Sequence, residues 1–145
     1  MTASQQAFNN HLSVETLHHL RPGDIDALGH LNHARAVELF ELGRFDWVKR
    51  RSIDIDPSCV PVVTRVDIRY QREIFLSEVV IRTCLKGLMH FSVEFLQTLH
   101  LRQNDASCAV VGNIWLSFIE RTTRHPIRVR RLDFLAGLID TTALS

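Results

Sequence analysis

A polar cluster runs directly into a long segment of helical character between residues 24 and 47, and this segment constrains the fold more than any other. The cluster supplies two carboxylates, a glycine, two imidazoles and an amide, at Asp24, Asp26, Gly29, His30, Asn32 and His33. From His33 onward the chain carries good helix formers and no proline until Pro57. Because Asn is among the preferred N-cap residues, Asn32 is predicted to cap a helix that starts at the next residue.

The predicted helix has one narrow apolar face. Ala36, Phe40, Gly43 and Trp47 follow one another at spacings of four, three and four residues, which places them on one stripe. Small and large side chains alternate along this stripe, so another backbone can approach the small ones while the aromatic rings fill the space beside them. The stripe therefore predicts packing of the helix against a curved sheet.

The position of Asp26 just before the helix indicates acyl chemistry. A helix N-terminus exposes unpaired backbone N–H groups that stabilise a carboxylate or a developing oxyanion. An aspartate held there stays ionised at neutral pH and can act as a general base or a nucleophile. From spacing alone, however, such an aspartate is more often a turn or capping residue. His30 and His33 can equally be surface residues, and a metal shared by His18, His19, His30 and His33 lacks further ligands at suitable spacing.

The remainder of the chain predicts five strands, at residues 11–20, 62–70, 79–85, 89–101 and 107–119. The strand at 62–70 alternates as a half-buried strand does, and the strand at 107–119 is apolar on both faces as a central strand is. We expect a loop at 54–61, a turn near 86–87 and a hairpin at 102–105, while Gly112 predicts a bend or a close backbone approach. We expect residues 1–9 to be a polar lead-in and 126–145 to be a C-terminal tail, of which 126–138 is either a solvated basic turn followed by a packed end or a short helix. This order of elements predicts an α+β fold.

Composition predicts one globular domain over residues 1–145, with 46% hydrophobic residues and a formal net charge of +1. The small net charge favours neither nucleic acid nor an anionic membrane as a partner. Three cysteines, Cys59, Cys84 and Cys108, show no paired spacing, and the N-terminus does not resemble a signal peptide. These features predict a cytoplasmic protein with free thiols, no metal and no cofactor.

The motif Asp-x-Asp-x-x-Gly followed by a polar helix start and a Glu-x-x-Arg pair resembles that of the acyl-CoA thioesterases of the hotdog-fold superfamily. The matching residues are Asp24, Asp26, Gly29, His33, Glu41 and Arg44. The resemblance is to the 4-hydroxybenzoyl-CoA thioesterase-like branch that includes the short-chain thioesterases of the Tol-Pal cluster. It covers roughly residues 10 to 135, and it implies a single hotdog domain in which an antiparallel sheet of about five strands wraps around one long central helix.

The resemblance also implies roles for individual residues. It places the catalytic carboxylate on Asp26 and a second functional residue on His33. The run from Gly29 to Asn32 is similar to the Gly-His-Val-Asn run of acyl-ACP thioesterases, so Gly29, His30 and Asn32 are expected to contact or orient the substrate. The Ser or Thr that the family carries near the start of the fourth strand falls around His90 and Ser92 here, and the aromatic residue early in the family's helix is replaced by Ala36. Another hotdog branch uses a glutamate of the long helix, so Glu38 and Glu41 remain alternative carboxylates.

The function predicted from these observations is hydrolysis of acyl-CoA thioesters, with helix N–H groups as the oxyanion hole. The resemblance implies a homodimer or a homotetramer with the acyl site between subunits. The arginines at 69, 72, 82, 128, 130 and 131 are candidates for binding the coenzyme A phosphates. Two alternatives stay open. One is an acyl-CoA-binding module without catalysis, and the other is a hotdog hydratase or dehydratase, which the absence of the usual proline after His30 disfavours.

Overall fold

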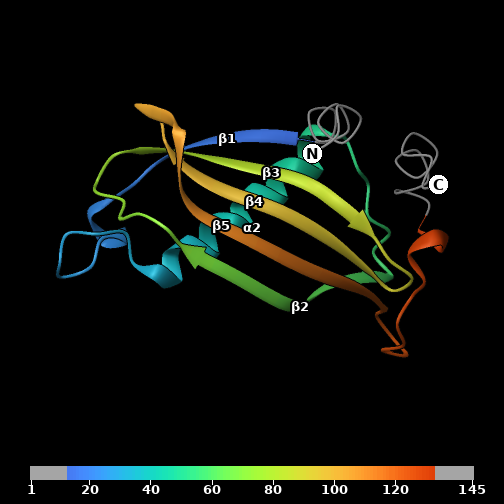
Figure 1. Ribbon diagram of the computed structural model, residues 1–145. Helices are drawn as coiled ribbons and strands as arrows, with labels where there is room; N and C mark the ends of the chain where they lie inside the picture. Colours follow the sequence, from blue (N-terminus) through green and yellow to red (C-terminus); the bar gives the residue numbers. More distant parts are fainter. Residues whose placement is uncertain (1–12, 133–145) are drawn as a thin grey trace.

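The computed structural model describes residues 13–132, which form one antiparallel sheet and one long helix (Figure 1). The elements in chain order are β1 (Ser13–His19), a 3₁₀ turn (Pro22–Asp24), α2 (His33–Arg50), β2 (Cys59–Tyr70), β3 (Glu78–Leu88), β4 (Ser92–Leu101), β5 (Asn104–Glu120) and a 3₁₀ turn (Val129–Arg131). The strand order across the sheet is β1-β3-β4-β5-β2. The helix crosses one face of the sheet, mainly against β1, β3 and β4. The α+β prediction of five strands and one long helix is thereby confirmed.

The start and the buried face of α2 are as the sequence predicts. The Asn32 side chain accepts a hydrogen bond of 2.8 Å from the backbone N–H of Ala34, so Asn32 is the N-cap. Ala36 and Phe40 are fully buried, and Trp47 is only 2% exposed. Gly43 is buried on the same stripe. Amphipathic spacing and a capping residue therefore suffice to define this helix and the face that it turns to the sheet.

The predicted half-burial of the strand at residues 62–70 is wrong. Most residues of β2 are exposed, including Val62, Val63, Val66 and Tyr70. The physical reason is its place in the sheet: β2 is an edge strand that pairs with β5 alone and that α2 leaves largely uncovered. The strand also begins earlier than expected, at Cys59, and includes Pro61, which the prediction assigned to a loop. An edge strand tolerates proline because one side of its backbone has no strand to pair with.

The predicted turn near residues 86–87 is also wrong, because β3 continues through a bulge between Leu85 and Gly87 as far as Leu88. The chain reverses at residues 89–91 instead, so β4 begins at Ser92 and Phe91 lies exposed before it. The hairpin between β4 and β5 is shorter than expected, since β5 already starts at Asn104. A bulge shifts the in/out alternation of a strand by one residue, so the period-two pattern stops at the bulge although the strand continues.

Two further predictions concern β5 and the tail. The strand is central, between β4 and β2, and a Cβ atom at Gly112 would lie 2.6 Å from the Phe40 ring, which confirms a close approach there. Of the predicted tail helix, the described part is a three-residue 3₁₀ turn at Val129–Arg131. The lead-in at residues 1–9 and the tail beyond residue 132 lie outside the described residues.

Candidate active site

The loop between the first 3₁₀ turn and α2 holds Asp26 in a network of backbone hydrogen bonds. One carboxylate oxygen of Asp26, Oδ1, accepts from the backbone N–H groups of Leu28 at 2.9 Å and of His30 at 3.1 Å. The Asp26 N–H donates to the His30 carbonyl at 2.8 Å, and the Gly29 N–H donates to the Asp26 carbonyl at 3.1 Å. Gly29 has a φ of 86°, a value that suits glycine, so the predicted tight turn is confirmed. The two side-chain hydrogen bonds of the turn thus both engage Oδ1 of the carboxylate.

This network keeps Asp26 ionised. The backbone hydrogen bond from His30 is the main cause that lowers the pKa of Asp26 below its ordinary value, and the bond from Leu28 and the nearby imidazoles of His30 and His33 act in the same direction. The ionised carboxylate that the sequence predicts therefore follows chiefly from the loop itself, because the N–H groups that stabilise the charge come from the turn that precedes the helix.

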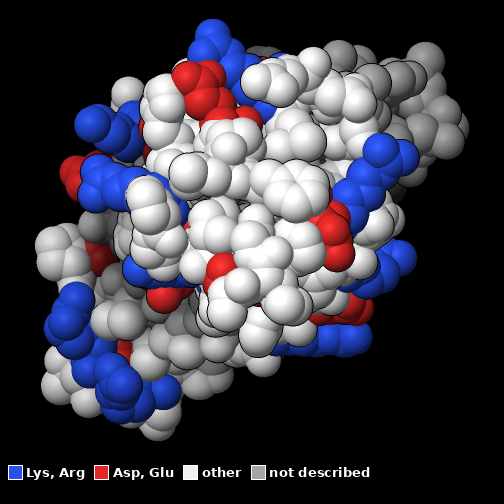
Figure 2. All heavy atoms as spheres, turned by 90° about the vertical axis from the view of Figure 1, so that its left-hand side faces the viewer, with Lys and Arg blue, Asp and Glu red and all other residues white. Residues whose placement is uncertain are grey.

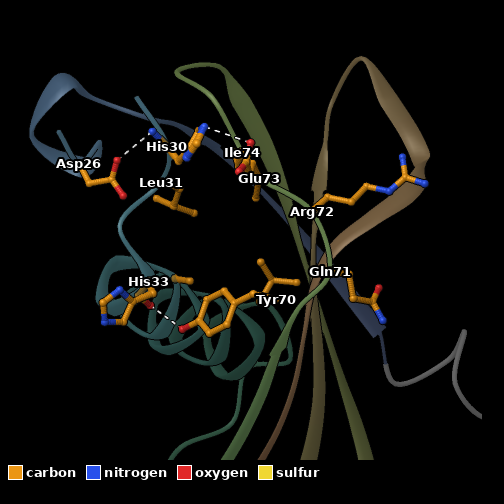
Figure 3. Close-up of a pocket in the computed structure, with 11 residues that line it drawn as sticks. Asp26, His30, Leu31, His33, Tyr70, Gln71, Arg72, Glu73 and Ile74 are labelled. Atoms are coloured by element: carbon orange, nitrogen blue, oxygen red, sulfur yellow. Dashed lines mark hydrogen bonds and ion pairs between the residues drawn. The ribbon is translucent and has the colours of Figure 1, made fainter. Parts of the chain in front are cut away.

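Asp26 lies at a cavity of about 620 Å³ between this loop, the start of α2 and the end of β2 (Figure 3). The cavity is lined by Asp26, His30, Leu31, His33, Ala36, Tyr70, Gln71, Arg72, Glu73, Ile74 and Val110. The lining is chemically mixed: Leu31, Ala36, Ile74 and Val110 are apolar, whereas the other lining residues carry polar or charged groups. A ligand with an apolar part and a polar reactive group fits such a site.

The loop that connects β2 to β3 forms the opposite wall and is bonded to the Asp26 loop at three points. Glu73 Oε2 lies 3.0 Å from His30 Nε2, and the His30 and Phe75 rings meet edge to face with their centroids 5.2 Å apart. The Leu31 N–H donates to the Ile74 carbonyl at 2.7 Å. Figure 3 shows His30 between Asp26 and Glu73. Glu73 was not among the predicted site residues, because no local pattern links a residue of this loop to a histidine 43 positions earlier.

The start of α2 is fixed to the end of β2 by Tyr70. The Tyr70 hydroxyl donates a hydrogen bond of 2.7 Å to the His33 carbonyl, and the two rings meet edge to face with centroids 6.4 Å apart. Burial raises the pKa of Tyr70, so the hydroxyl keeps the proton that it donates. The His33 side chain thereby stands at the cavity, one helical position after the N-cap. Tyr70 was predicted only as a strand residue.

Several predicted site residues do not line this cavity. Gly29 and Asn32 shape the loop and cap the helix, respectively. His90 and Ser92 lie at the opposite end of the sheet, where β3 turns into β4, so a single protomer does not bring them to Asp26. The alternative carboxylates are also elsewhere, since Glu38 pairs with Arg35 and Glu41 lines a different cavity. Among the predicted residues, the structure brings together Asp26, His30 and His33.

The candidate arginines are scattered. Arg72 lines the cavity, and Figure 3 shows its side chain pointing away from Asp26. Arg82 pairs with Glu15 on the face of the sheet that is turned away from α2, and the arginines at 128, 130 and 131 lie near the 3₁₀ turn after β5. Figure 2 shows the end of the molecule that carries the Asp26 loop, where basic side chains lie mostly toward the margin, with acidic side chains beside several of them. Among these candidate arginines, Arg72 alone lines the cavity.

A second cavity of about 270 Å³ lies beside the C-terminal half of α2. Its walls are mostly apolar, with Phe45, Ile53 and Val63 among the lining residues and with Glu41 and Arg44 as its charged groups. Within residues 13–132, no cluster of three or more His, Cys, Asp or Glu side chains could hold a metal ion. No helix in the same range is long and apolar enough to cross a membrane.

Comparison with known proteins agrees with this architecture. The family model of the thioesterase-like superfamily matches residues 20–133. The fold is similar to that of the DHNA-CoA thioesterase from Staphylococcus aureus, with a TM-score of 0.81, 20% sequence identity and coverage of 91% of this chain and 92% of that chain. A predicted thioesterase from Bacillus stearothermophilus has a TM-score of 0.75 and 17% identity, with 90% and 96% of the two chains covered. No curated protein sequence matches the chain.

A 1,4-dihydroxy-2-naphthoyl-CoA thioesterase from Synechocystis shares the same fold at only 6% identity, with a TM-score of 0.74 and coverage of 82% of this chain and 90% of that chain. The hotdog fold that the resemblance implies is thereby confirmed, whereas the Tol-Pal branch stays a prediction. The family match spans most of the chain and includes the Asp26 loop, α2 and all of β2 to β5. The chain belongs to the thioesterase-like superfamily, and its enzyme class is that of the thioester hydrolases.

Proposed function

We propose that the protein hydrolyses acyl-CoA thioesters to a free acid and coenzyme A, with Asp26 as the working carboxylate. The observation that carries this proposal is the geometry of Asp26, whose Oδ1 is held by two backbone N–H groups while the carboxylate lies at the cavity. A carboxylate that is fixed and ionised at neutral pH is suited to take a proton from water or to attack a carbonyl carbon.

In the general-base route, Asp26 accepts a proton from water while the water oxygen bonds to the thioester carbonyl carbon. The carbon–sulfur bond then breaks, and the coenzyme A thiolate leaves and takes up a proton. In the nucleophilic route, Asp26 attacks the carbon itself, the carbon–sulfur bond breaks with departure of the coenzyme A thiolate, which takes up a proton, and water hydrolyses the resulting anhydride to the free acid and the Asp26 carboxylate. In both routes the carbonyl oxygen gains negative charge, which N–H groups at the first turn of α2 stabilise. The N–H of Ala34 already donates to Asn32, so the N–H of His33 is a candidate donor.

The direct test is release of free thiol from a panel of acyl-CoAs that runs from short to long aliphatic chains and includes benzoyl and phenylacetyl esters. We expect turnover of at least one class, because the site combines an ionised carboxylate with apolar lining. Binding of the same esters without turnover of any would refute hydrolysis and would favour the acyl-CoA-binding module.

For binding of the coenzyme A phosphates we propose Arg72, the one arginine that lines the cavity.

We further propose that the protein forms a homodimer through the edge of β2, alone or within a tetramer. The support is the exposed apolar surface of this strand, since Val66 is 44% exposed and Tyr70 50% exposed on an edge that pairs with no other described strand. Phe45, on the neighbouring outer face of α2, is 66% exposed. Unpaired backbone groups and apolar side chains on one edge favour pairing with a second copy.

Val66→Lys is expected to convert the assembly to monomers, because it places a charge in the middle of the proposed interface. Light scattering after size-exclusion chromatography measures the mass directly. Leu17→Lys is the matched control, because Leu17 is exposed to a similar degree on β1, the opposite edge of the sheet. A wild-type protein of 16.7 kDa in solution, or a Val66→Lys protein of unchanged mass, would contradict the β2 interface.

A further inference from the structure

His30 joins the two loops that face each other across the cavity. Its backbone belongs to the Asp26 loop, where its N–H donates to the Asp26 carboxylate and its carbonyl accepts from the Asp26 N–H. Its ring contacts the β2–β3 loop, where Nε2 pairs with Glu73 and the ring meets that of Phe75 edge to face. The same residue therefore contacts the carboxylate of the proposed mechanism and a second carboxylate across the cavity.

We infer that Glu73 is a positioning residue for the proposed thioester hydrolysis, and that it acts through His30. Glu73 holds the imidazole at 3.0 Å, the imidazole fixes the backbone of residue 30, and that backbone fixes the orientation of the Asp26 carboxylate. This inference rests on the proposed function, because it assigns a role in the same site.

The Asp26 loop depends on its neighbours for a fixed position, because it has little regular structure. The segment from residue 25 to residue 31 has no helix or strand of its own, and an isolated bridge between Ile25 and Leu31 closes it. The Leu31 to Ile74 hydrogen bond and the two contacts of the His30 ring join this loop to the β2–β3 loop. Catalytic groups that are misplaced by about 1 Å can lose about a hundredfold in rate. A side chain that immobilises residue 30 therefore also fixes the position of the Asp26 carboxylate.

Glu73 is suited to this role although its side chain is largely exposed. Half-buried His30 donates to it across the cavity, and a hydrogen bond that involves a charged group is stronger than one between neutral groups. The other titratable side chains that line the cavity are His33, Tyr70 and Arg72. The Tyr70 hydroxyl donates its hydrogen bond to the His33 carbonyl, and the Arg72 side chain points away from Asp26. Among the lining residues, Glu73 is the one that forms an ion pair with the His30 ring.

The test compares steady-state kinetics of Glu73→Ala and Glu73→Gln on an acyl-CoA that the wild type hydrolyses. Glu73→Ala is expected to lower kcat by about tenfold, while KM changes little, because Asp26 is displaced and the acyl contacts remain. The acid limb of the pH–rate profile should move to higher pH, because the His30 N–H is the main cause of the low pKa of Asp26. Glu73→Gln should recover most of the activity, since its amide oxygen can still accept from His30 Nε2.

A double-mutant cycle then asks whether Glu73 acts through His30. If it does, Glu73→Ala has no further effect on kcat in a His30→Ala protein. The matched control is Glu15→Ala, which removes an exposed glutamate from an ion pair with Arg82 on the far face of the sheet and should leave kcat and the pH profile unchanged. Thermal unfolding of each variant identifies any loss of folded protein, and the kinetics are compared only per folded molecule.

The outcomes separate failure of this inference from failure of the proposed function. If wild type hydrolyses the ester in an Asp26-dependent manner and Glu73→Ala keeps the wild-type kcat and pH profile, the positioning role is wrong while the thioesterase stands. A Glu73→Ala protein that is less stable but unchanged in kcat and pH profile overturns the inference in the same way. If wild type has no activity, or Asp26→Asn keeps it in full, it is the proposed function that fails.

Discussion

Asp26→Asn is expected to lower kcat for acyl-CoA hydrolysis by at least about a hundredfold, because a positioned acid or base supplies a factor of roughly 10² to 10⁴. The amide of Asn keeps an oxygen that can accept from Leu28 and His30, so the loop should retain its shape. The side chain nevertheless can neither take a proton from water nor attack the thioester. Thiol release under saturating substrate, with KM measured in parallel, distinguishes lost chemistry from lost binding.

Asp24→Asn is the control for this experiment, because it makes the same change two residues earlier. Asp24 accepts from the Arg21 N–H and pairs with Arg35, and it does not line the cavity. It should therefore keep most of the wild-type rate. Full activity of Asp26→Asn would exclude the mechanism, and Glu38 and Glu41 would become the next carboxylates to replace.

The pH dependence of the wild type tests the same assignment. The pKa of Asp26 is lowered, so its folded-state carboxylate stays charged to lower pH than an ordinary aspartate. Activity that requires this charge is present above the lowered pKa and is lost as the pH falls through it. The acid limb of kcat/KM should accordingly lie below the ordinary aspartate value of about 3.9. A limb near pH 6.5 would instead point to an imidazole as the essential group.

The parts of this site that the sequence predicts are those in which a short stretch of chain determines its own geometry. Asp26, Gly29 and Asn32 lie within seven positions, and the hydrogen bonds that hold them come mostly from the same segment. A turn glycine, a capping amide and an apolar helical stripe are local signals, so the loop, the N-cap and the buried face of α2 could all be predicted.

Contacts between distant segments could not be predicted in this way. The pairing of His30 with Glu73 depends on how the β2–β3 loop returns to α2, which a single sequence does not encode in any pattern. The predicted half-burial of β2 is wrong for a related reason. Alternation tells which side chains share a face of a strand, but not whether a helix covers that face or whether the strand lies at an edge. His90 and Ser92 were placed by resemblance, and the strand order puts them at the other end of the sheet.

Gly43→Ala is expected to destabilise the protein, although alanine is the better helix former. A Cβ atom built at Gly43 would lie 2.6 Å from Thr83 Oγ1, 2.8 Å from Ile81 Cγ2 and 3.0 Å from Gln97 Nε2. Thr83 and Ile81 belong to β3 and Gln97 to β4, so the helix rests on the sheet at this glycine. All three neighbours are fully buried and have no room to move aside.

The neighbours also carry a buried polar network that the added methyl group would disturb. Gln97 Nε2 donates to the Phe40 carbonyl at 2.7 Å and to Thr83 Oγ1 at 2.8 Å, and Gln97 Oε1 accepts from Arg44 at 2.9 Å. Overpacking of a core costs about 1 to 3 kcal/mol, and a buried polar group left without its partner costs about 1 to 3 kcal/mol. The gain in helix propensity is only about 1 kcal/mol. The unfavourable effects therefore prevail.

We expect Gly43→Ala to lower the free energy of unfolding by about 2 kcal/mol, measured by urea denaturation at an unchanged m-value. Gly23→Ala is the matched control, because a Cβ atom at Gly23 would meet no atom within 4 Å and its φ is not in the left-handed region. Its stability should stay within about 0.5 kcal/mol of wild type. If Gly43→Ala proved as stable as wild type, α2 would have moved away from β3 and β4 without cost. The position of His33 and of the Asp26 loop would then be less tightly fixed by the sheet than the contacts at Gly43 indicate.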